Sequence, residues 1–490
     1  MRPTTPSTTT ASRDRRWLIL GVLGLAQLMV VLDATIVNIA LPSAQEALGF
    51  SDASRQWIIT AYALSFGSLL LLGGRIGDYF GRKWTFVAGL SGFAVASAVG
   101  GMAQSFEVLV AARAAQGAFG ALLAPAALSL LTTTFTDPGQ RGKAFGIYGA
   151  IAGGGGAVGL LLGGVLTEYL SWRWCLYVNL GFAIPAAIGG LLLLQHRALT
   201  ARPKLDVPGT LTAVDGLLAL VYGLTKAETD GWGAAVTLGF LAAAAVLLTG
   251  FVLIQRRSAH PLLPMRVVLD RNRGGAFAAV GIVGAGMFGV FLFLTYYLQQ
   301  TLGLSPVETG LAFLPMIGAL MITSTATSAT VLPRVGPKPL VTAGMLLAAA
   351  GLLLLTQVGV DSTYAAHVLP GLLVIGVGLG LAMATAMATA TLGVRPGDAG
   401  VASATVNTMQ QIGGSIGTAL LSTVAASATS SYAASHASAT DAMTQAAVHG
   451  YRTAFWWSTA IFAVGAIVCG LLLRPGTPRV DPAAEPVLAH

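Results

Sequence analysis

Apolar stretches about twenty residues long recur along the whole of this 490-residue chain, and no other feature constrains its fold as strongly. A helix of that length spans the ~30 Å hydrocarbon core of a lipid bilayer. Only 9% of the residues are charged, whereas about 25% are charged in an average soluble protein. The sequence therefore predicts an all-α, polytopic membrane protein and excludes an ordinary soluble globular fold.

Fourteen windows are long and apolar enough to be transmembrane helices. The first seven lie near residues 17–41, 56–74, 84–104, 107–130, 145–167, 174–194 and 208–226. The last seven lie near residues 234–254, 275–297, 309–331, 339–358, 366–391, 400–425 and 452–473. An even number of spans places both termini on the same side of the membrane.

The basic residues indicate which side that is. Of the 27 Lys and Arg residues, 22 fall in tails and loops on the side of the termini, and Arg113 lies within a span. Four fall on the other side, namely Arg55, Arg173, Lys226 and Arg452. Because cytoplasmic loops carry the excess of Lys and Arg, both termini are predicted to be cytoplasmic. Membrane orientation also explains the net charge of +8 without a nucleic-acid partner.

A weak internal repeat indicates how the spans are grouped. Gly336-Pro337-Lys338 follows the tenth span at an offset of 255 residues from Gly81-Arg82-Lys83 after the second, and the same offset carries the Gly159 region onto Gly414. Contiguous six-helix halves need only about 200 residues of offset, so spans seven and eight are predicted to be an inserted pair. The predicted segments are a tail at 1–16, a six-helix bundle at 17–200, two extra helices at 201–257, a second bundle at 258–474 and a tail at 475–490. The Ala/Ser/Thr-rich stretch 426–450 is expected to be a poorly packed external loop.

Three ionisable residues lie inside predicted spans, where such groups are costly and therefore candidates for function. Asp33 and Arg113 both lie about eight residues from the outer ends of their helices, so both are expected about 12 Å below the surface. A carboxylate beside a cation in low dielectric gains or loses a proton with a small change of geometry. The alternative is a static ion pair that fixes two helices. Asp215 has no basic residue at its own depth, so it is either a solvated or hydrogen-bonded accessory group or a further candidate for proton or substrate coupling.

The loop between the second and third spans has a distinctive pattern, Gly74-x3-Asp78-x2-Gly81-Arg82-Lys83. Its glycines permit a tight turn, and Arg82 and Lys83 anchor it in the cytoplasm. The pattern resembles the signature loop of the major facilitator superfamily.

Further motifs resemble those of the fourteen-span drug:proton antiporters within that superfamily. They are Leu32-Asp33-Ala34-Thr35-Ile36-Val37-Asn38-Ile39-Ala40-Leu41-Pro42, Arg113-Ala-Ala-Gln116-Gly117, Ser171-Trp172-Arg173-Trp174 to Asn179, Tyr297-Leu298-Gln299-Gln300, and Ala399-Gly400-Val401-Ala402-Ser403 to Asn407. The resemblance implies two six-helix bundles plus two inserted helices, and export of lipophilic drugs or antibiotics in exchange for protons. It implies proton and substrate coupling by Asp33 and Arg113, and a conformational switch that involves Asp78 and Arg82.

One motif departs from that family's pattern. The fifth helix of the antiporters normally carries Gly-Pro-x-x-Gly-Gly, whereas this chain has Gly159-Leu160-Leu161-Leu162-Gly163-Gly164. Gly155, Gly159 and Gly163 still form a ridge of small residues that allows close helix approach. A packing role for these glycines is at least as well supported as a gating role.

The sequence favours drug export over the other functions of a polytopic membrane protein. ATP-driven export is disfavoured because the chain has no Gly-x4-Gly-Lys-Ser/Thr loop. A transporter of a small metabolite on the same fold is the alternative, and polar residues expected near the centre could line its cavity or that of an exporter: Asn38, Gln116, Asn407, Gln410 and Gln411. A membrane enzyme is disfavoured because the six histidines lie in loops, at span ends or in the tail. A channel is disfavoured because no filter-like repeat occurs.

The remaining expectations concern partners and location. Two distant cysteines, Cys175 and Cys469, give no metal or disulfide framework, and no cofactor is expected. The partners expected are a small lipophilic substrate, protons and the lipid bilayer, with the protein acting as a monomer. Only five of the basic residues are Lys, and such Arg-rich composition suggests a GC-rich bacterial genome and hence the bacterial cell membrane.

Overall fold

The computed structural model describes residues 8–51, 54–135, 138–195, 206–258, 261–392, 394, 399–436 and 441–476. Within these ranges every regular element is a helix. Twelve of the described helices are long and apolar enough to cross a membrane, so the expectation of an all-helical, multi-pass membrane protein is confirmed. The count of fourteen spans stays a prediction. Residues 1–7 and 477–490 of the predicted tails lie outside the described ranges.

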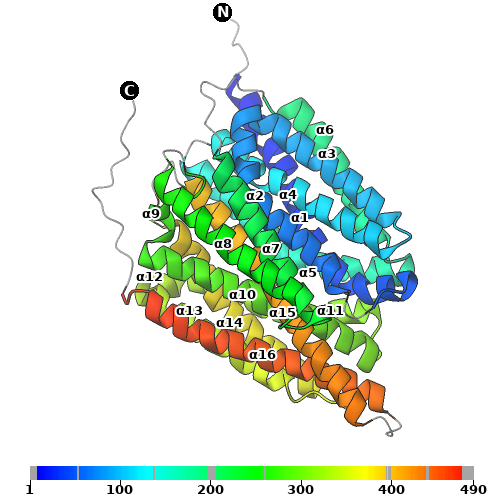
Figure 1. The fold of residues 1–490 in the computed structure, drawn as a ribbon. Helices are drawn as coiled ribbons and strands as arrows, with labels where there is room; N and C mark the ends of the chain where they lie inside the picture. Colours follow the sequence, from blue (N-terminus) through cyan, green and yellow to red (C-terminus); the bar gives the residue numbers. More distant parts are fainter. Residues whose placement is uncertain are drawn as a thin grey trace, which may run out of the picture. The chain divides into compact units, whose positions relative to one another are not determined.

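The described residues form two compact units, of which the first lies within Met1–Leu248 and Thr295–Phe313. Its helices are α1 Thr8–Leu48, α2 Gln56–Phe80, α3 Arg82–Gly101, α4 Phe106–Thr134, α5 Pro138–Tyr169, α6 Trp174–Leu193, α7 Val207–Asp230 and most of α8 Ala235–Arg257. In this unit α4 packs on α2 and α3, and α1 packs on α5 and α6 (Figure 1). These contacts bring α1, α4 and α6 together around one apolar core.

The second unit lies within Thr249–Leu294 and Leu314–His490. Its elements are α9 Met265–Val268, most of α10 Arg271–Tyr296, most of α11 Pro306–Ala326, the π-helix η2 Thr327–Val331, α12 Leu332–Val335, α13 Pro337–Leu355, the π-helix η3 Tyr364–Val368, α14 Leu369–Thr391, α15 Ala399–Ser435 and α16 Ala442–Leu472. A further π-helix, η1 Tyr297–Thr301, follows α10 and counts with the first unit. In the second unit α13 packs on α14 and α16, and α15 packs on α16. The predicted division at residues 17–200, 201–257 and 258–474 stays a prediction.

Glycines allow one pair of helices in each unit to approach closely. A Cβ added to Gly159 of α5 would overlap Thr35 Oγ1 of α1. In the second unit a Cβ added to Gly413 of α15 would overlap the Gly281 carbonyl oxygen of α10. Close backbone approach through small residues is the usual way in which helices associate within a membrane, where no hydrophobic effect drives them together.

The two glycines that the repeat places at equivalent positions form similar turns. Gly81 ends α2 and begins α3 with φ 96°, and Gly336 ends α12 and begins α13 with φ 84°. Both φ values lie in the region that favours glycine because a side chain there is strained. The local conformation of the two turns therefore matches the repeat seen in the sequence.

The expected loose loop at 426–450 is wrong for its described part. Helix α15 continues to Ser435 and α16 begins at Ala442. Tyr432 Oη donates to Gln445 Oε1 at 3.1 Å, and the Tyr432 ring stacks 4.9 Å from that of His449. Alanine has the highest helix propensity, and these contacts hold the two helix ends to each other.

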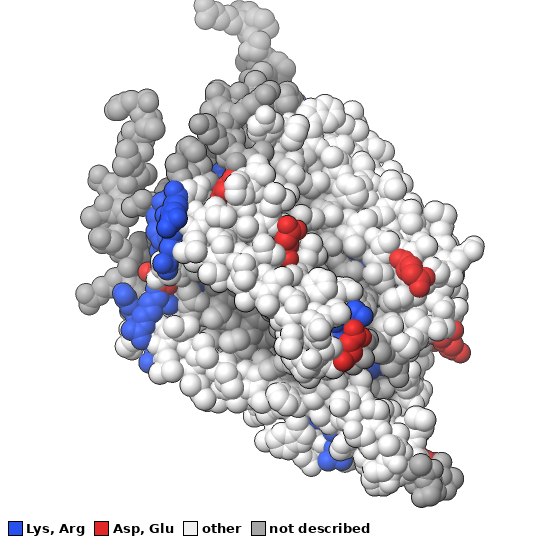
Figure 2. Space-filling model, in the orientation of Figure 1, with Lys and Arg blue, Asp and Glu red and all other residues white. Residues whose placement is uncertain are grey.

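Basic side chains gather at the helix ends of the second unit. Arg256 and Arg257 end α8, Arg266 lies in α9 and Arg334 lies in α12. Figure 2 shows Lys and Arg side chains gathered over the region of α9 and α12, while most of the surface in view is uncharged. This distribution is the one expected when helix ends meet the lipid headgroups and helix lengths face hydrocarbon.

Candidate functional site

A buried ion pair joins α1 to α4. Arg113 NH1 of α4 donates to Asp33 Oδ2 of α1 at 2.6 Å, and the two side chains are 2% and 0% exposed. The two residues predicted at equal depth thus meet in the interior of the first unit. Removing one partner of such a pair leaves an uncompensated buried charge, at a cost of about 3–5 kcal/mol.

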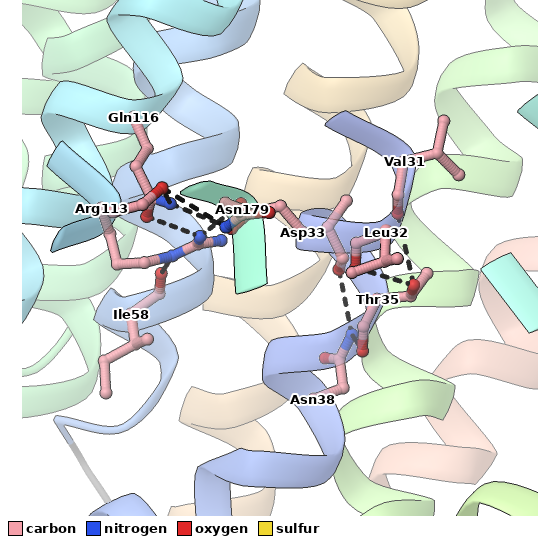
Figure 3. A network of polar contacts seen from close by, with 11 residues as sticks. Val31, Leu32, Asp33, Thr35, Asn38, Ile58, Arg113, Gln116 and Asn179 are labelled. Atoms are coloured by element: carbon pink, nitrogen blue, oxygen red, sulfur yellow. Dashed lines mark hydrogen bonds and ion pairs between the residues drawn. The ribbon is translucent and has the colours of Figure 1, made fainter. Parts of the chain in front are cut away.

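Two amides complete the shell around the carboxylate. Asp33 Oδ1 accepts from Gln116 Nε2 of α4 at 2.9 Å and from Asn179 Nδ2 of α6 at 2.7 Å. Figure 3 shows Arg113, Gln116 and Asn179 converging on Asp33. All three partners offer N–H groups to the carboxylate, so the arrangement suits its ionised form.

Ser97 of α3 links the two amides. Its Oγ accepts from Gln116 Nε2 at 2.7 Å and from Asn179 Nδ2 at 3.3 Å. Each amide nitrogen carries two N–H groups, so each can donate to Asp33 and to Ser97 together. The cluster therefore connects four helices: α1, α4 and α6 meet at the carboxylate, and α3 joins them through Ser97 and the two amides.

Arg113 is held from three further directions. Its Nε donates to the Ile58 carbonyl oxygen of α2 at 3.1 Å, and NH1 also donates to Gln116 Oε1 at 2.9 Å. Its guanidinium carbon lies 4.3 Å from the centre of the Tyr62 ring, a cation–π contact. The guanidinium therefore has three partners besides Asp33.

Two buried polar atoms of this region lack a partner. Asn179 Oδ1 and Tyr62 Oη accept and donate no hydrogen bond within the described part of the chain. An unpaired buried polar group costs about 1–3 kcal/mol. Such orphans are uncommon in native interiors.

A small recess reaches Arg113 from the end of the unit at which α6 begins. Its lining comes from α1, α2, α4 and α6 and from the segment before α6: Val37, Ala40, Leu41, Ala44, Ile58, Leu109, Arg113, Trp172, Cys175 and Leu176. Apart from Arg113, these side chains are apolar or, for Cys175, weakly polar. Arg113 is therefore the charged side chain in the lining of this recess.

The glycine ridge of α5 lies against the α1 segment that carries Asp33. A Cβ at Gly155 would lie 3.1 Å from Val31 Cγ1, and a Cβ at Gly163 would lie 2.9 Å from the Ile36 carbonyl oxygen. At Gly164 a Cβ would lie 2.6 Å from the Pro306 carbonyl oxygen, at the start of α11. Helix α5 runs without interruption from Pro138 to Tyr169. This continuity agrees with the absence of the family's proline, which would kink or break the helix.

The turn between α2 and α3 is fixed by a contact with α6. Lys83 Nζ donates to the Leu191 carbonyl oxygen at 2.8 Å, close to the C-terminus of α6, where a cation is favourable. A Cβ at Gly74 would meet Pro125 at an ordinary 3.6 Å. Arg82 is half-buried at the first position of α3. The side chain of Asp78 lies outside the described ones.

The other predicted site residues lie apart from the Asp33 cluster. Asp215 is exposed on α7, and none of the described residues forms a hydrogen bond or ion pair with it. Asn38 is buried one turn after Asp33, and its Nδ2 donates to the Ala34 and Thr35 carbonyl oxygens of its own helix. On α15 of the second unit, Asn407 is exposed and Gln410 and Gln411 are half-buried. Gln116, predicted to line a cavity, is fully buried within the cluster instead.

Sequence reasoning missed Asn179, Ser97 and Tyr62 as members of the site. Asn179 stands in a recognised motif, and a buried amide within an apolar span was a signal for it. Ser97 carries no such signal, because single serines are common in membrane helices. Among the described residues no group of three or more His, Cys, Asp or Glu could hold a metal ion.

Comparison with known proteins places these features in a family. A model of the Major Facilitator Superfamily matches residues 23–418. The puromycin resistance protein pur8 of Streptomyces alboniger is 50% identical over 469 residues, covering 95% of this chain and 93% of that protein. The cephamycin export protein CmcT of Amycolatopsis lactamdurans is 38% identical over 83% of this chain and 84% of that protein. An auto-inhibited POT family peptide transporter has the same fold, with a TM-score of 0.69 at 16% identity over 96% of this chain and 98% of that one.

Proposed function

The chain belongs to the major facilitator superfamily, and we propose that it exports antibiotics or other lipophilic drugs across the bacterial cell membrane in exchange for protons. The names of the relatives support the substrate class, because they include resistance or export proteins for puromycin, cephamycin, tetracenomycin and lincomycin. Puromycin is the first compound to test, since the puromycin resistance protein is 50% identical over almost the whole chain.

The observation that carries the proton coupling is the buried Asp33–Arg113 pair at 2.6 Å. Asp33 is the proton acceptor, and Arg113 is the cation that holds it ionised. A proton that reaches the site from outside converts the carboxylate to a neutral acid and removes most of the attraction between the two side chains. The four helices joined by the cluster then repack, and substrate leaves as the proton enters.

One proton per cycle supplies enough free energy for export. Moving a single charge through 100 mV yields about 2.3 kcal/mol, which sustains a roughly fifty-fold gradient of a neutral substrate. A single titrating carboxylate therefore suffices. Arg113 keeps its charge throughout the cycle. While Asp33 is protonated, the guanidinium still donates to the Ile58 carbonyl oxygen and lies over the Tyr62 ring.

We propose fourteen spans, with both termini cytoplasmic and α7 and α8 as an inserted pair between two six-helix bundles. The uneven distribution of basic residues supports the orientation. Reporter fusions after residue 230 and after residue 265 are expected outside and inside the cell, respectively. An exchanged result contradicts the topology. The protein is proposed to function as a monomer.

The turn between α2 and α3 is proposed as the conformational switch, with Gly74, Asp78, Gly81, Arg82 and Lys83 as its residues. The positive φ of Gly81 and the bond from Lys83 to α6 support this role. Helix ends at such a turn must rearrange when the bundle changes state. Four glycines of α5 are proposed to transmit movement of neighbouring helices to α5, because they have no side chain between the two backbones: Gly155, Gly159, Gly163 and Gly164.

Substrate contacts are proposed for the polar residues Asn38, Asn407, Gln410 and Gln411, whereas Gln116, the fifth candidate, is engaged by Asp33, Arg113 and Ser97. Monovalent lipophilic cations or neutral aromatic antibiotics are the expected substrates, because Asp33 and Asp215 are the only acidic residues inside the proposed spans apart from Glu107 at the first position of one, and balancing two buried charges is costly. Stronger efflux of divalent than of monovalent cations contradicts this expectation. The alternative, a transporter of a small metabolite, confers no drug resistance on a pump-deficient strain.

Asp33→Asn tests the proposed function directly. The amide mimics the protonated carboxyl and cannot release a proton, so vesicles that carry the variant should lose substrate-induced proton movement and uphill efflux under an imposed pH gradient. Asp33→Glu retains an ionisable group and should keep part of both. Membrane insertion, checked by reporter fusions, should be normal in each variant. Undiminished proton exchange in Asp33→Asn contradicts the assignment and transfers suspicion to Asp215.

A further inference from the structure

We propose that the side-chain amide of Asn179 turns over when Asp33 takes up a proton, so that it donates to the carboxylate in one state and accepts from the carboxylic acid in the other. This inference rests on the proposed function, since it concerns the protonated form of the same carboxyl group. It makes Asn179 a positioning residue for the proton rather than a group that carries the proton.

The present orientation of the amide follows from the chemistry of its neighbours. An ionised carboxylate only accepts hydrogen bonds, so the atom of Asn179 that lies 2.7 Å from Asp33 Oδ1 must be the N–H donor. The same Nδ2 lies 3.3 Å from Ser97 Oγ. The amide oxygen consequently points away from the carboxylate, into a buried position where no described atom donates to it.

A protonated Asp33 needs the opposite arrangement. Its new O–H requires an acceptor, yet Arg113 offers only donors, and Gln116 faces Asp33 with its Nε2 while its oxygen accepts from Arg113. Among the side chains that bond Asp33, Asn179 Oδ1 is the acceptor left unused. Rotation by half a turn about the Cβ–Cγ bond exchanges Oδ1 with Nδ2 in nearly the same space, and this torsion is two-fold and soft in asparagine.

The charged and titratable groups around the site leave Asp33 as the one whose state changes. Arg113 on α4 stays protonated at any pH the cell meets. Tyr62 on α2 contacts Arg113 through its ring. Cys175 on α6 has its Sγ 3.3 Å from Thr167 Oγ1. On α5, Tyr148 donates to Gln27 Oε1, almost two turns before Asp33 along α1.

The turnover gives Asp33 a matching partner in each protonation state, namely a donor when it is ionised and an acceptor when it is protonated. When the carboxylate is ionised, the charge-assisted bond to Nδ2 outweighs the unpaired amide oxygen, since such bonds are about twice as strong as neutral ones. When the proton arrives, that advantage is lost and Oδ1 gains the O–H donor of Asp33, while Nδ2 leaves its acceptors Asp33 and Ser97 and takes the position that Oδ1 held. The amide therefore changes partner because the charge changes, with no need for the backbone of α6 to move.

Isotope-edited infrared spectroscopy can observe this turnover, because the chain has only four asparagines, Asn38, Asn179, Asn272 and Asn407. The full-length protein, labelled with ¹³C at the asparagine side-chain carbonyl, is reconstituted in lipid vesicles, and spectra are compared between acid and alkaline pH. We expect an asparagine carbonyl band to move to lower frequency at acid pH, because the oxygen then accepts a hydrogen bond. The shifting band should be missing in Asn179→Leu and should not respond to pH in Asp33→Asn.

The outcomes separate this inference from the proposed function. A carboxyl band that follows pH and is lost in Asp33→Asn, with no moving asparagine band in the wild-type protein, overturns the turnover and leaves Asp33 as the proton site. A carboxyl band that persists unchanged in Asp33→Asn, with none lost, overturns both. The decisive observation is made on the wild-type protein, so it does not depend on the folding of Asn179→Leu.

Discussion

The two compact units differ in what they bury. The first unit buries Asp33, Arg55 and Arg113 together with several amides. In the described part of the second unit no buried side chain is charged, and the buried polar groups are hydroxyls and the amide of Gln255. The repeat offset of 255 residues sharpens the contrast, since it carries Asp33 onto Phe288 and Arg113 onto Val368.

This difference indicates that the interiors of the two units suit different kinds of ligand. A proton or a cation can be held inside the first unit, where a carboxylate and its donors are built in. In its described part, the interior of the second unit offers hydroxyls, one amide and apolar side chains, which suit an uncharged or lipophilic molecule better than a charged one. Substitutions in both units test this contrast.

The largest effect is expected for Arg113→Leu. It leaves Asp33 buried without its cation, so the free energy of unfolding should fall by about 3–5 kcal/mol, measured by thermal or chemical unfolding in detergent. The double variant Asp33→Asn/Arg113→Leu should recover most of that loss. Thr385→Val is the matched change in the second unit, and it should be nearly neutral because the buried Thr385 hydroxyl has no partner to lose. Equal losses in both units would remove the contrast.

A large effect on transport, with little effect on stability, is expected for Asp78→Asn. The residue lies in the last turn of α2, before the Gly81 turn. The repeat offset of 255 residues carries it onto Pro333 in the second unit. Substrate efflux from vesicles should be strongly reduced while membrane insertion stays normal. If the carboxylate only caps a helix, the loss is about 1 kcal/mol of stability with transport at the wild-type rate.

An intermediate effect is expected from the glycine contacts. Gly159→Ala and Gly417→Ala each force a Cβ into the backbone or side chain of the facing helix, Thr35 in one unit and Ala285 in the other. Each should cost about 1–3 kcal/mol of stability in melting measurements. Gly154→Ala is the control, since its Cβ meets open space. A loss of efflux for Gly159→Ala beyond that for Gly417→Ala, at equal stability, assigns gating to the first unit.

The smallest effect is expected for Asp215→Asn. This carboxylate is exposed and unpaired within the described part of the chain, so its removal should change the free energy of unfolding by no more than about 0.5 kcal/mol. Export of neutral antibiotics should change least of all, measured as the inhibitory concentration for a pump-deficient strain that carries the variant. Loss of proton coupling in this variant would contradict the prediction and indicate a second titrating site in the first unit.

Helix type and the depth of single residues could be predicted from the sequence, whereas the direction of side chains could not. Equal depth sufficed to bring Asp33 and Arg113 together, because hydrophobic span length fixes height in the membrane. Which faces of α3 and α6 turn toward them depends on packing between helices, so Ser97 and Asn179 escaped. Gln116 was placed in a cavity for the same reason, and the helical ends at Ser435 and Ala442 were missed because serine and threonine suggested a loop.

The two cysteines of the chain can report which face of the protein is open. Both thiols are buried and unpaired, with Cys175 in the recess that reaches Arg113 and Cys469 near the end of α16. In the proposed topology the first lies near the outer membrane surface and the second near the inner one. Each unit thus carries one thiol, so the rate at which a small maleimide labels each cysteine reads out which face of the unmodified protein is open.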